Sequence, residues 1–339
     1  MIRKTFLCVF FLINTFYVAQ SQERIKMNLD ENWKFHFGNA ADPSKDFNFG
    51  IANIFSKSGN AGNTAINPRF NDSAWRTLNL PHDWAVELPF ENSPSFDVMA
   101  HGYKPVGGLY PETSIGWYRK KFFVNKSDSA KKISIQFDGI FRNASIWING
   151  FFLGNNKSGY IGAAYDLSDY LDYNKENTIV VRVDATQYEG WFYEGAGIYR
   201  HVWLNKTNKF HIKADELFIH SKTTGKNAIV TAEIPIVNQN AKIASGNAYT
   251  YITDRNGKKI SAYKSTTINV SQYGKVLIKQ QINITNPHLW SIEDPYLYRV
   301  ITILKSGNKT IDSLNTRFGI RTISISKDCL LYTSDAADE

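Results

Sequence analysis

The chain has 339 residues, of which 43% are hydrophobic and 14% aromatic, so it can bury substantial cores and is not a disordered segment. Its net charge is +8, but the lysines are scattered along predicted turns and form no basic run or helical stripe, which argues against a nucleic-acid-binding protein. The chain has 2 cysteines, Cys8 and Cys329, and this excludes a fold held together by a disulfide framework.

The first residues have the pattern of a secretory signal. Arg3 and Lys4 precede an apolar run from Phe6 to Val18, and small or polar residues follow it. The run is shorter than the ~20 residues that span a bilayer, and no later stretch approaches that length. We therefore expect a signal peptide at residues 1–20, a secreted or periplasmic protein, and no membrane span.

Residues 21–207 read as strands joined by turns. Lys132 to Phe137 alternates apolar and polar residues, and Thr178 to Asp184 is a β-branched run. Asn149-Gly150 lies between two apolar runs and predicts a hairpin, because a type I′ turn needs two residues that tolerate positive φ. The Gly, Asn and Ser-rich stretch from Asn48 to Asn67 predicts one long surface loop. The fold expected here is a jelly-roll β-sandwich.

Residues 208–322 form a second unit with fewer aromatic residues. Short strands recur, for example at Ala228 to Val237 and at Pro295 to Leu304, and turn residues separate them. The length suits an immunoglobulin-like β-sandwich, although the Cys-Trp-Cys pattern of true immunoglobulin domains is missing. The fold class predicted for the whole chain is all-β. Residues 323–339 are expected to be a short stub with an acidic, small-residue tail that has no strand or helix period.

The motifs of both units together resemble the non-catalytic front half of glycoside hydrolase family 2, which includes β-galactosidases, β-glucuronidases and β-mannosidases. They occur in the family's order across about Leu29 to Arg321. The motifs are LPHDW at Leu80, GWYRKKF at Gly116, FDGIFRNASIWING at Phe137, GAGIYR at Gly195, PHLWSIEDPYLY at Pro287 and TRFGIRT at Thr316.

Most of these residues also have simple structural explanations. Trp117, Trp147 and Trp203 lie in strand patterns, so packing is expected for them rather than sugar contact. The Pro-His-Asp-Trp turn is expected to be structural, with His82 or Asp83 satisfying backbone groups. The glycines Gly150, Gly195 and Gly197 are expected to serve backbone geometry.

The candidate substrate-binding residues come from the resemblance and from loop position. Tyr188 to Glu194 gathers two carboxylates and four aromatic rings in a loop between strands. The resemblance implies that this loop reaches the sugar pocket, with Glu189 as a substrate or cation contact and Trp191 beside it. Arg142 and Asn143, which end the FDGIFRN run, are the other candidates.

The resemblance implies hydrolysis of a terminal β-linked sugar with retention of configuration, which needs two carboxyl groups ~5–5.5 Å apart. In the family both are glutamates on a (β/α)₈ barrel of ~250 residues. Only 18 residues follow Arg321, so we expect no catalytic residue in this chain and no activity from it alone. Glu189 and Glu194 are rejected as that pair, because one loop offers no scaffold to fix their separation.

Several alternatives stay open at this point. β-Galactoside is the expected substrate of the parent enzyme and β-glucuronide the alternative. A stand-alone carbohydrate-binding or adhesion protein without catalysis is the alternative to an enzyme. The expected partner is an oligo- or polysaccharide, with a homo-oligomer left open because relatives associate through such domains. No cofactor is expected, and sodium or magnesium enters only by family analogy, since the seven histidines show no metal-ligand spacing.

Overall fold

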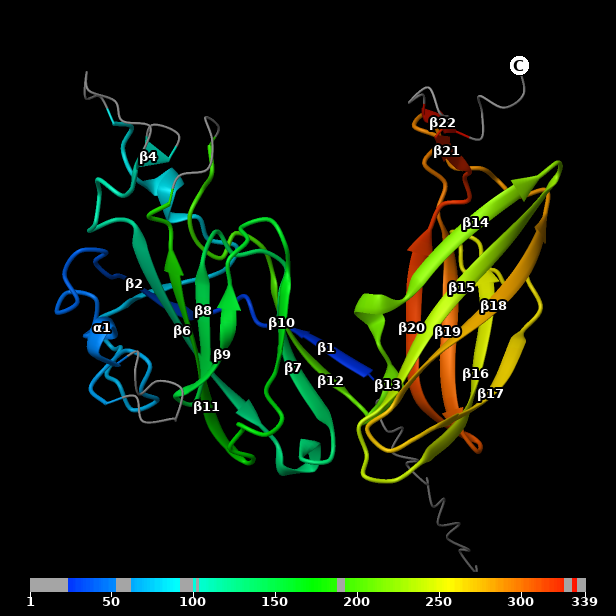
Figure 1. The fold of residues 1–339 in the computed structure, drawn as a ribbon, viewed down its shortest axis with the longest axis horizontal. Coiled ribbons are helices and arrows are strands. Elements are labelled where there is room, and N and C mark those ends of the chain that lie inside the picture. The colour runs from blue at the N-terminus through cyan, green and yellow to red at the C-terminus, as the bar shows by residue number, and fades with distance from the viewer. Residues whose placement is uncertain are drawn as a thin grey trace, which may run out of the picture.

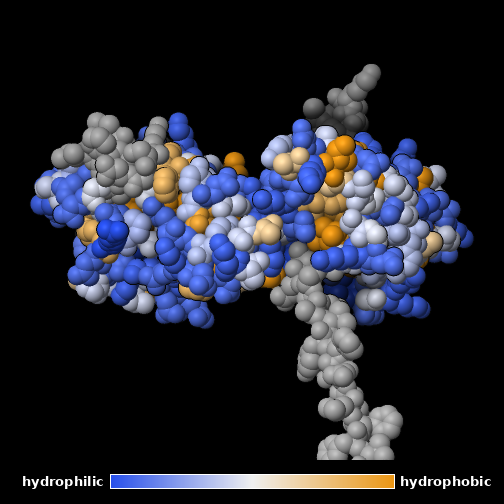
Figure 2. All heavy atoms as spheres, turned by 90° about the horizontal axis from the view of Figure 1, so that it is seen from below, coloured by the Kyte–Doolittle hydropathy of each residue, from blue (hydrophilic) through white to orange (hydrophobic). Residues whose placement is uncertain are grey.

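The computed structural model describes residues 24–52, 62–91, 100–101, 104–187, 193–325 and 331–333, whose regular secondary structure is almost entirely β-strand. The all-β prediction is confirmed. Two sandwiches lie side by side, and β1 and β12 lie at the junction between them (Figure 1). In the space-filling view the two bodies meet at a narrow waist (Figure 2). Within these residues no helix is long and apolar enough to cross a membrane.

Two sheets form the first sandwich. One has the strand order β1-β12-β7-β10, and the other has the order β3-β2-β6-β11-β8-β9. The strands of the first sandwich are β1 Arg24–Asn28, β2 Trp33–Phe37, β3 Arg76–Leu78, β6 Ile115–Val124, β7 Lys132–Phe137, β8 Ala144–Ile148, β9 Phe151–Asn156, β10 Ala163–Asp166, β11 Lys175–Asp184 and β12 Val202–Thr207. A short pair, β4 Ala100–His101 and β5 Lys104–Gly107, lies beside them.

In the described ranges, helical structure is confined to short turns. The α-helix α1 covers Phe49–Ala52, and 3₁₀ turns cover Trp84–Glu87, Lys126–Asp128 and Ala214–Glu216. The first of these turns begins after Asp83, whose side chain accepts a hydrogen bond from the Ala85 amide as an N-cap.

The predicted hairpin at Asn149-Gly150 is confirmed. Ile148 pairs with Phe151, and the two connecting residues have φ of 49° and 86°, as a type I′ turn requires. The turn places the buried Trp147 on the face that packs in a stack against Trp117, with ring centroids 6.0 Å apart. Both rings are fully buried, so their predicted packing role is confirmed.

Trp203 differs from that prediction. It is only half-buried, on the outer face of the β1-β12-β7-β10 sheet. Its indole Nε1 donates to Asp138 at 2.7 Å, and the ammonium of Lys26 lies 4.2 Å from its ring centroid. Alternation along β12 decides this, because Val202 and Leu204 take the inward positions.

The predicted surface loop from Asn48 to Asn67 is wrong at both ends, since α1 occupies Phe49–Ala52. Ala65 and Ile66 are fully buried and join a small aromatic core with Trp75 and Trp117. The strands β6 and β8 place the rings of Trp117 and Trp147 on the outer face of their sheet. Ala65 and Ile66 pack over this face and shield the rings from solvent.

The second sandwich has its own core and two four-stranded sheets. In one, β15 pairs with β13, β14 and β18, and the other has the order β17-β16-β19-β20. The strands are β13 Phe210–Ile212, β14 Phe218–Thr224, β15 Asn227–Asn238, β16 Ala244–Thr253, β17 Lys264–Val270, β18 Lys275–Thr285, β19 Tyr298–Ser306 and β20 Lys309–Phe318. A final pair joins β21 Ile323–Ile325 to β22 Leu331–Thr333, so the expectation that the tail forms no strand is wrong at β22.

Candidate functional site

Three of the sequence motifs meet at one end of the first sandwich. The amides of His82 and Trp84 donate to the carbonyls of Ile198 and Ala196, so LPHDW runs alongside GAGIYR. Gly116 of GWYRKKF leaves room for the Trp84 ring, because a Cβ there would lie 2.3 Å from a ring carbon. The motifs therefore build one interlocked end of the jelly roll.

Gly197 is required at this junction. Its φ is +125°, and a Cβ would lie 2.5 Å from both the His82 carbonyl and the Tyr118 hydroxyl. Gly195 also has a positive φ, of +73°. The predicted backbone role of these glycines is confirmed.

Asp83 anchors the segment that leads out of the candidate loop. Its Oδ1 accepts from the amides of Ala85 and Ala196 at 3.0 and 2.8 Å, and its Oδ2 accepts from the hydroxyl of Tyr193 at 2.8 Å. Burial, together with the hydrogen bond to the Asp83 carboxylate, raises the pKa of Tyr193 far above its usual value. Tyr193 therefore stays a neutral donor that ties the loop end to the LPHDW turn.

A polar chain runs beneath this turn, from the buried Tyr118 and His82 to the exposed Glu87 and Arg76. Nδ1 of His82 lies 2.7 Å from the hydroxyl of Tyr118, and Nε2 lies 3.3 Å from Oε1 of Glu87. Glu87 in turn accepts two hydrogen bonds from Arg76, at 2.6 and 2.7 Å. Burial lowers the pKa of His82, and the neighbouring Glu87 only partly opposes that effect.

The pH dependence of stability follows from His82. Its folded-state pKa lies below the ordinary value near 6.5, so on acidification the unfolded chain binds a proton there before the folded protein does. We expect the unfolding free energy to fall below about pH 6.5, by up to ~1.4 kcal/mol per pH unit from this group. Urea unfolding between pH 7.5 and 5.5 should show a shallower dependence in His82→Gln. Equal slopes in both proteins would contradict a shifted His82.

The structure brings Arg142 and Asn143 to the same end. Phe141, just before them, exchanges two backbone hydrogen bonds with Gly197, at 2.8 and 2.7 Å. Arg142 is 8% exposed, its guanidinium carbon lies 5.7 Å from the Phe141 ring centroid, and its carbonyl accepts from the Asp184 amide. Asn143 is half-buried with a φ of 46°.

Glu189 and Trp191, the other two candidates, lie outside the described residues. The described flank of their loop is Tyr193 and Glu194, and Glu194 is 6% exposed. The prediction that Asp83 satisfies backbone groups is confirmed by the amides of Ala85 and Ala196, whereas sequence reasoning missed the hydrogen bond from Tyr193 to Asp83. A signal existed for Asp83, since Asp directly before a short apolar turn is a typical N-cap.

What the described residues of this end can do is hold and orient. The side chains of Arg142 and Glu194 are nearly buried here, and Asp83 accepts hydrogen bonds from Tyr193 and Ala196. No group of three or more His, Cys, Asp or Glu side chains that could hold a metal occurs among the residues that the structure describes.

Comparison with known proteins decides the family. The profile of the sugar binding domain of glycosyl hydrolases family 2 matches residues 65–208, and a second profile of glycosyl hydrolases family 2 matches residues 210–321. The chain belongs to glycosyl hydrolase family 2. The resemblance inferred from the six motifs is thereby confirmed.

Relatives of this chain are named for two activities. The chain is 34% identical to the β-galactosidase BoGH2A of Bacteroides ovatus, over 91% of the chain and 32% of that protein. It is 31% identical to a putative β-glucuronidase of Formosa agariphila, over 94% of the chain and 27% of that protein. The chain thus spans about a third of the length of these family 2 relatives.

Solved structures of the family have the same fold. A β-glycosidase from Bacteroides vulgatus superposes with a TM-score of 0.74 and 30% sequence identity, covering 91% of this chain and 36% of that one. A family 2 member from Bacteroides cellulosilyticus gives a TM-score of 0.73 at 29% identity. The pair of sandwiches is therefore an architecture that this chain shares with these two solved proteins.

Proposed function

We propose that this chain is the amino-terminal, non-catalytic portion of a secreted family 2 glycosidase that removes terminal β-linked sugars with retention of configuration. The observation that carries the proposal is the interlocked loop end built from three motifs, where Asp83 accepts hydrogen bonds from Tyr193 and Ala196. In this proposal the loop that contains Glu189 and Trp191 forms one wall of the sugar subsite, together with Arg142 and Asn143. The two catalytic carboxyl groups lie on a barrel domain outside this chain.

The proposed substrate is a β-galactoside. The 34% identity to a β-galactosidase over 91% of the chain supports this choice. The putative β-glucuronidase at 31% makes β-glucuronide the competing substrate.

Hydrolysis of nitrophenyl glycosides tests the proposal. The purified chain should release no nitrophenol from the β-galactoside or the β-glucuronide. A version extended through the gene sequence that follows Asp328 should hydrolyse the β-galactoside more than about a hundredfold faster than the β-glucuronide, because a site built to pair polar groups discriminates strongly.

Each other result contradicts a separate part of the proposal. Hydrolysis by the short chain would place the carboxylates within it, and Glu189→Gln and Glu194→Gln would then be compared. Preference of the extended version for the glucuronide would overturn the substrate, and inactivity on both sugars would overturn the glycosidase role.

A further inference from the structure

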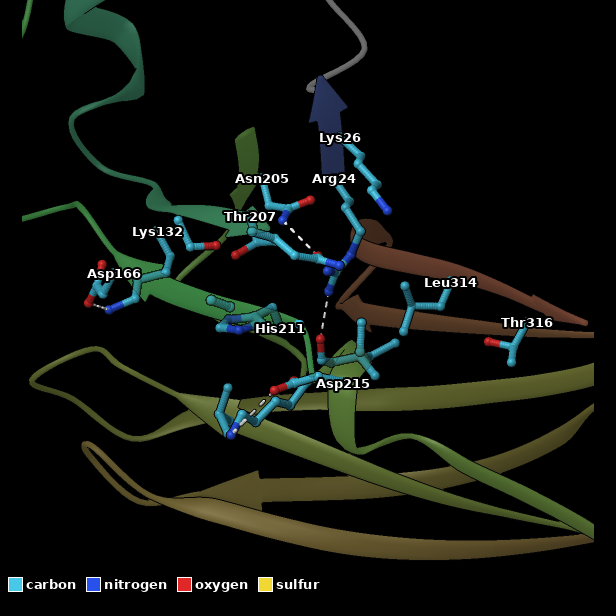
Figure 3. A pocket seen from close by; sticks show the side chains of 18 of the residues that line it. Arg24, Lys26, Lys132, Asp166, Asn205, Thr207, His211, Asp215, Leu314 and Thr316 are labelled. Carbon is cyan, nitrogen blue, oxygen red and sulfur yellow. Dashed lines mark hydrogen bonds and ion pairs between the residues drawn. The ribbon is translucent and has the colours of Figure 1, made fainter. Parts of the chain in front are cut away.

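A groove lies between the two sandwiches. Its volume is about 1320 Å³, and its walls come from β1, β7, β10 and β12 on one side and from β13, β15 and β20 on the other. Figure 3 shows Arg24 and Lys26 entering it from β1, with Leu314 and Thr316 across from them and His211 beneath. The groove is therefore a product of the two-domain arrangement and not of either sandwich alone.

One buried polar atom in the lining lacks a partner. Oε1 of Gln239 accepts no hydrogen bond from the described residues, whereas the neighbouring His211 bonds to the backbone of Lys209 and Asn208. Gln239 lies close to His211, because His211 pairs with Val237 across the β13–β15 ladder and Gln239 follows two residues later. Buried polar groups are normally hydrogen-bonded, so unpaired ones in a groove point to a polar ligand.

Two cations of the lining are not neutralised by the protein. Lys26 and Arg317 have no carboxylate within 4 Å in the described part of the chain, and both side chains are exposed. The other cations of the groove are paired: Arg24 with Asp312, Lys132 with Asp166, and Lys213 and Lys275 with Glu216. Because Lys26 belongs to the first sandwich and Arg317 to the second, an anion in the groove can meet charge from both walls.

The remaining lining suits hydroxyl groups. Gln136, Asn205 and Asn315 present carboxamides, which both donate and accept, and Ser134, Thr207 and Thr316 add hydroxyls. Asn205 donates to Gln136 at 3.3 Å, which leaves further donor and acceptor positions on that row. A nucleic acid carries one charge per ~1.7 Å of duplex, far more than two uncompensated cations can match.

We propose that this groove binds an acidic oligosaccharide, with Lys26 and Arg317 on its anionic groups and with Gln239, Asn205 and Gln136 on its hydroxyls. The shared chemistry is a polyhydroxylated chain that carries carboxylate or sulfate. The site belongs to this chain itself, so it stands whether or not the glycosidase proposal holds, and the nitrophenyl assays do not bear on it.

Isothermal titration of the purified chain at low salt tests the groove. The probes are a galacturonate tetrasaccharide, a sulfated carrageenan tetrasaccharide and a neutral galactose tetrasaccharide. We expect at least one acidic probe to bind and the neutral one to bind about tenfold more weakly, since surface charge attraction is lost. Comparing the two acidic probes identifies carboxylate or sulfate as the recognised group.

Variants locate the binding. Lys26→Gln and Arg317→Gln should each weaken the acidic probe about threefold to tenfold, as should Gln239→Leu. Lys222→Gln is the matched control, because Lys222 is an exposed lysine on β14 outside the groove and its loss changes the net charge equally. The proposal is overturned if no acidic probe binds, if the groove variants bind like the unaltered chain, or if Lys222→Gln weakens binding as much as they do.

Discussion

Replacing Arg182 by alanine is expected to lower the unfolding free energy by about 3–5 kcal/mol, because it leaves a buried carboxylate without its cation. Asp46 is 3% exposed, and its Oδ2 accepts from Nε and Nη2 of Arg182 at 3.0 and 2.7 Å. Its Oδ1 accepts from the Trp117 indole at 2.6 Å. Burial raises the pKa of Asp46, and Arg182 and Trp117 oppose that rise, so Asp46 depends on both for its charged form.

Urea unfolding followed by circular dichroism measures this change. The double variant Arg182→Met with Asp46→Leu is the control, since an apolar pair of similar volume removes the charge that the single variant strands. We expect the double variant to regain part of the lost stability. A single variant as stable as the unaltered chain would show that the ion pair contributes nothing net.

Replacing Arg24 by alanine is expected to loosen the two sandwiches from each other. Arg24 of β1 makes two hydrogen bonds to Asp312 of β20, at 2.9 and 2.6 Å, and one to the carbonyl of Ile212. Asp312 is fully buried, and the amides of Ile212 and Ser313 are its other donors. Because Arg24 itself is 19% exposed, we expect a smaller loss of about 2–4 kcal/mol.

The unfolding profile of Arg24→Ala tells whether the sandwiches are coupled. We expect one cooperative transition for the unaltered chain and two separated transitions for the variant, since each sandwich has its own hydrophobic core. Lys26→Ala, two residues along the same strand at an exposed position, should leave the profile unchanged. An unaltered single transition in Arg24→Ala would contradict this coupling.

Much of the fold could be predicted because its determinants are local. Alternation at Lys132 to Phe137 and the Asn149-Gly150 dipeptide encode a strand and a hairpin within a few residues, and both occur as expected. The position of the candidate site could be predicted only in part. Arg142 and Asn143 lie at the motif cluster, while the sugar contacts assigned to all four candidates remain predictions.

The features that sequence reasoning missed depend on contacts between distant residues. Asp46 and Arg182 are 136 positions apart, and Arg24 and Asp312 are 288 apart, so no periodicity connects them. The burial of Ile66 likewise arises because Trp117 and Trp147 need a cover, which the polar composition of the preceding loop conceals. A sequence pattern predicts whether a side chain points into or out of a sheet, but it does not identify which distant residue that side chain will contact.

The interlocking of LPHDW, GWYRKKF and GAGIYR also bears on what such signatures can reveal. The ring of Trp84 occupies the space that Gly116 leaves empty, and Gly197 admits the His82 carbonyl. Each motif is thus a steric condition on the others, and an enlarged residue in one demands a compensating change in its neighbour. Proteins that cleave different sugars can meet these conditions equally well. These motifs therefore identify the β-sandwich fold and do not distinguish which sugar a protein cleaves.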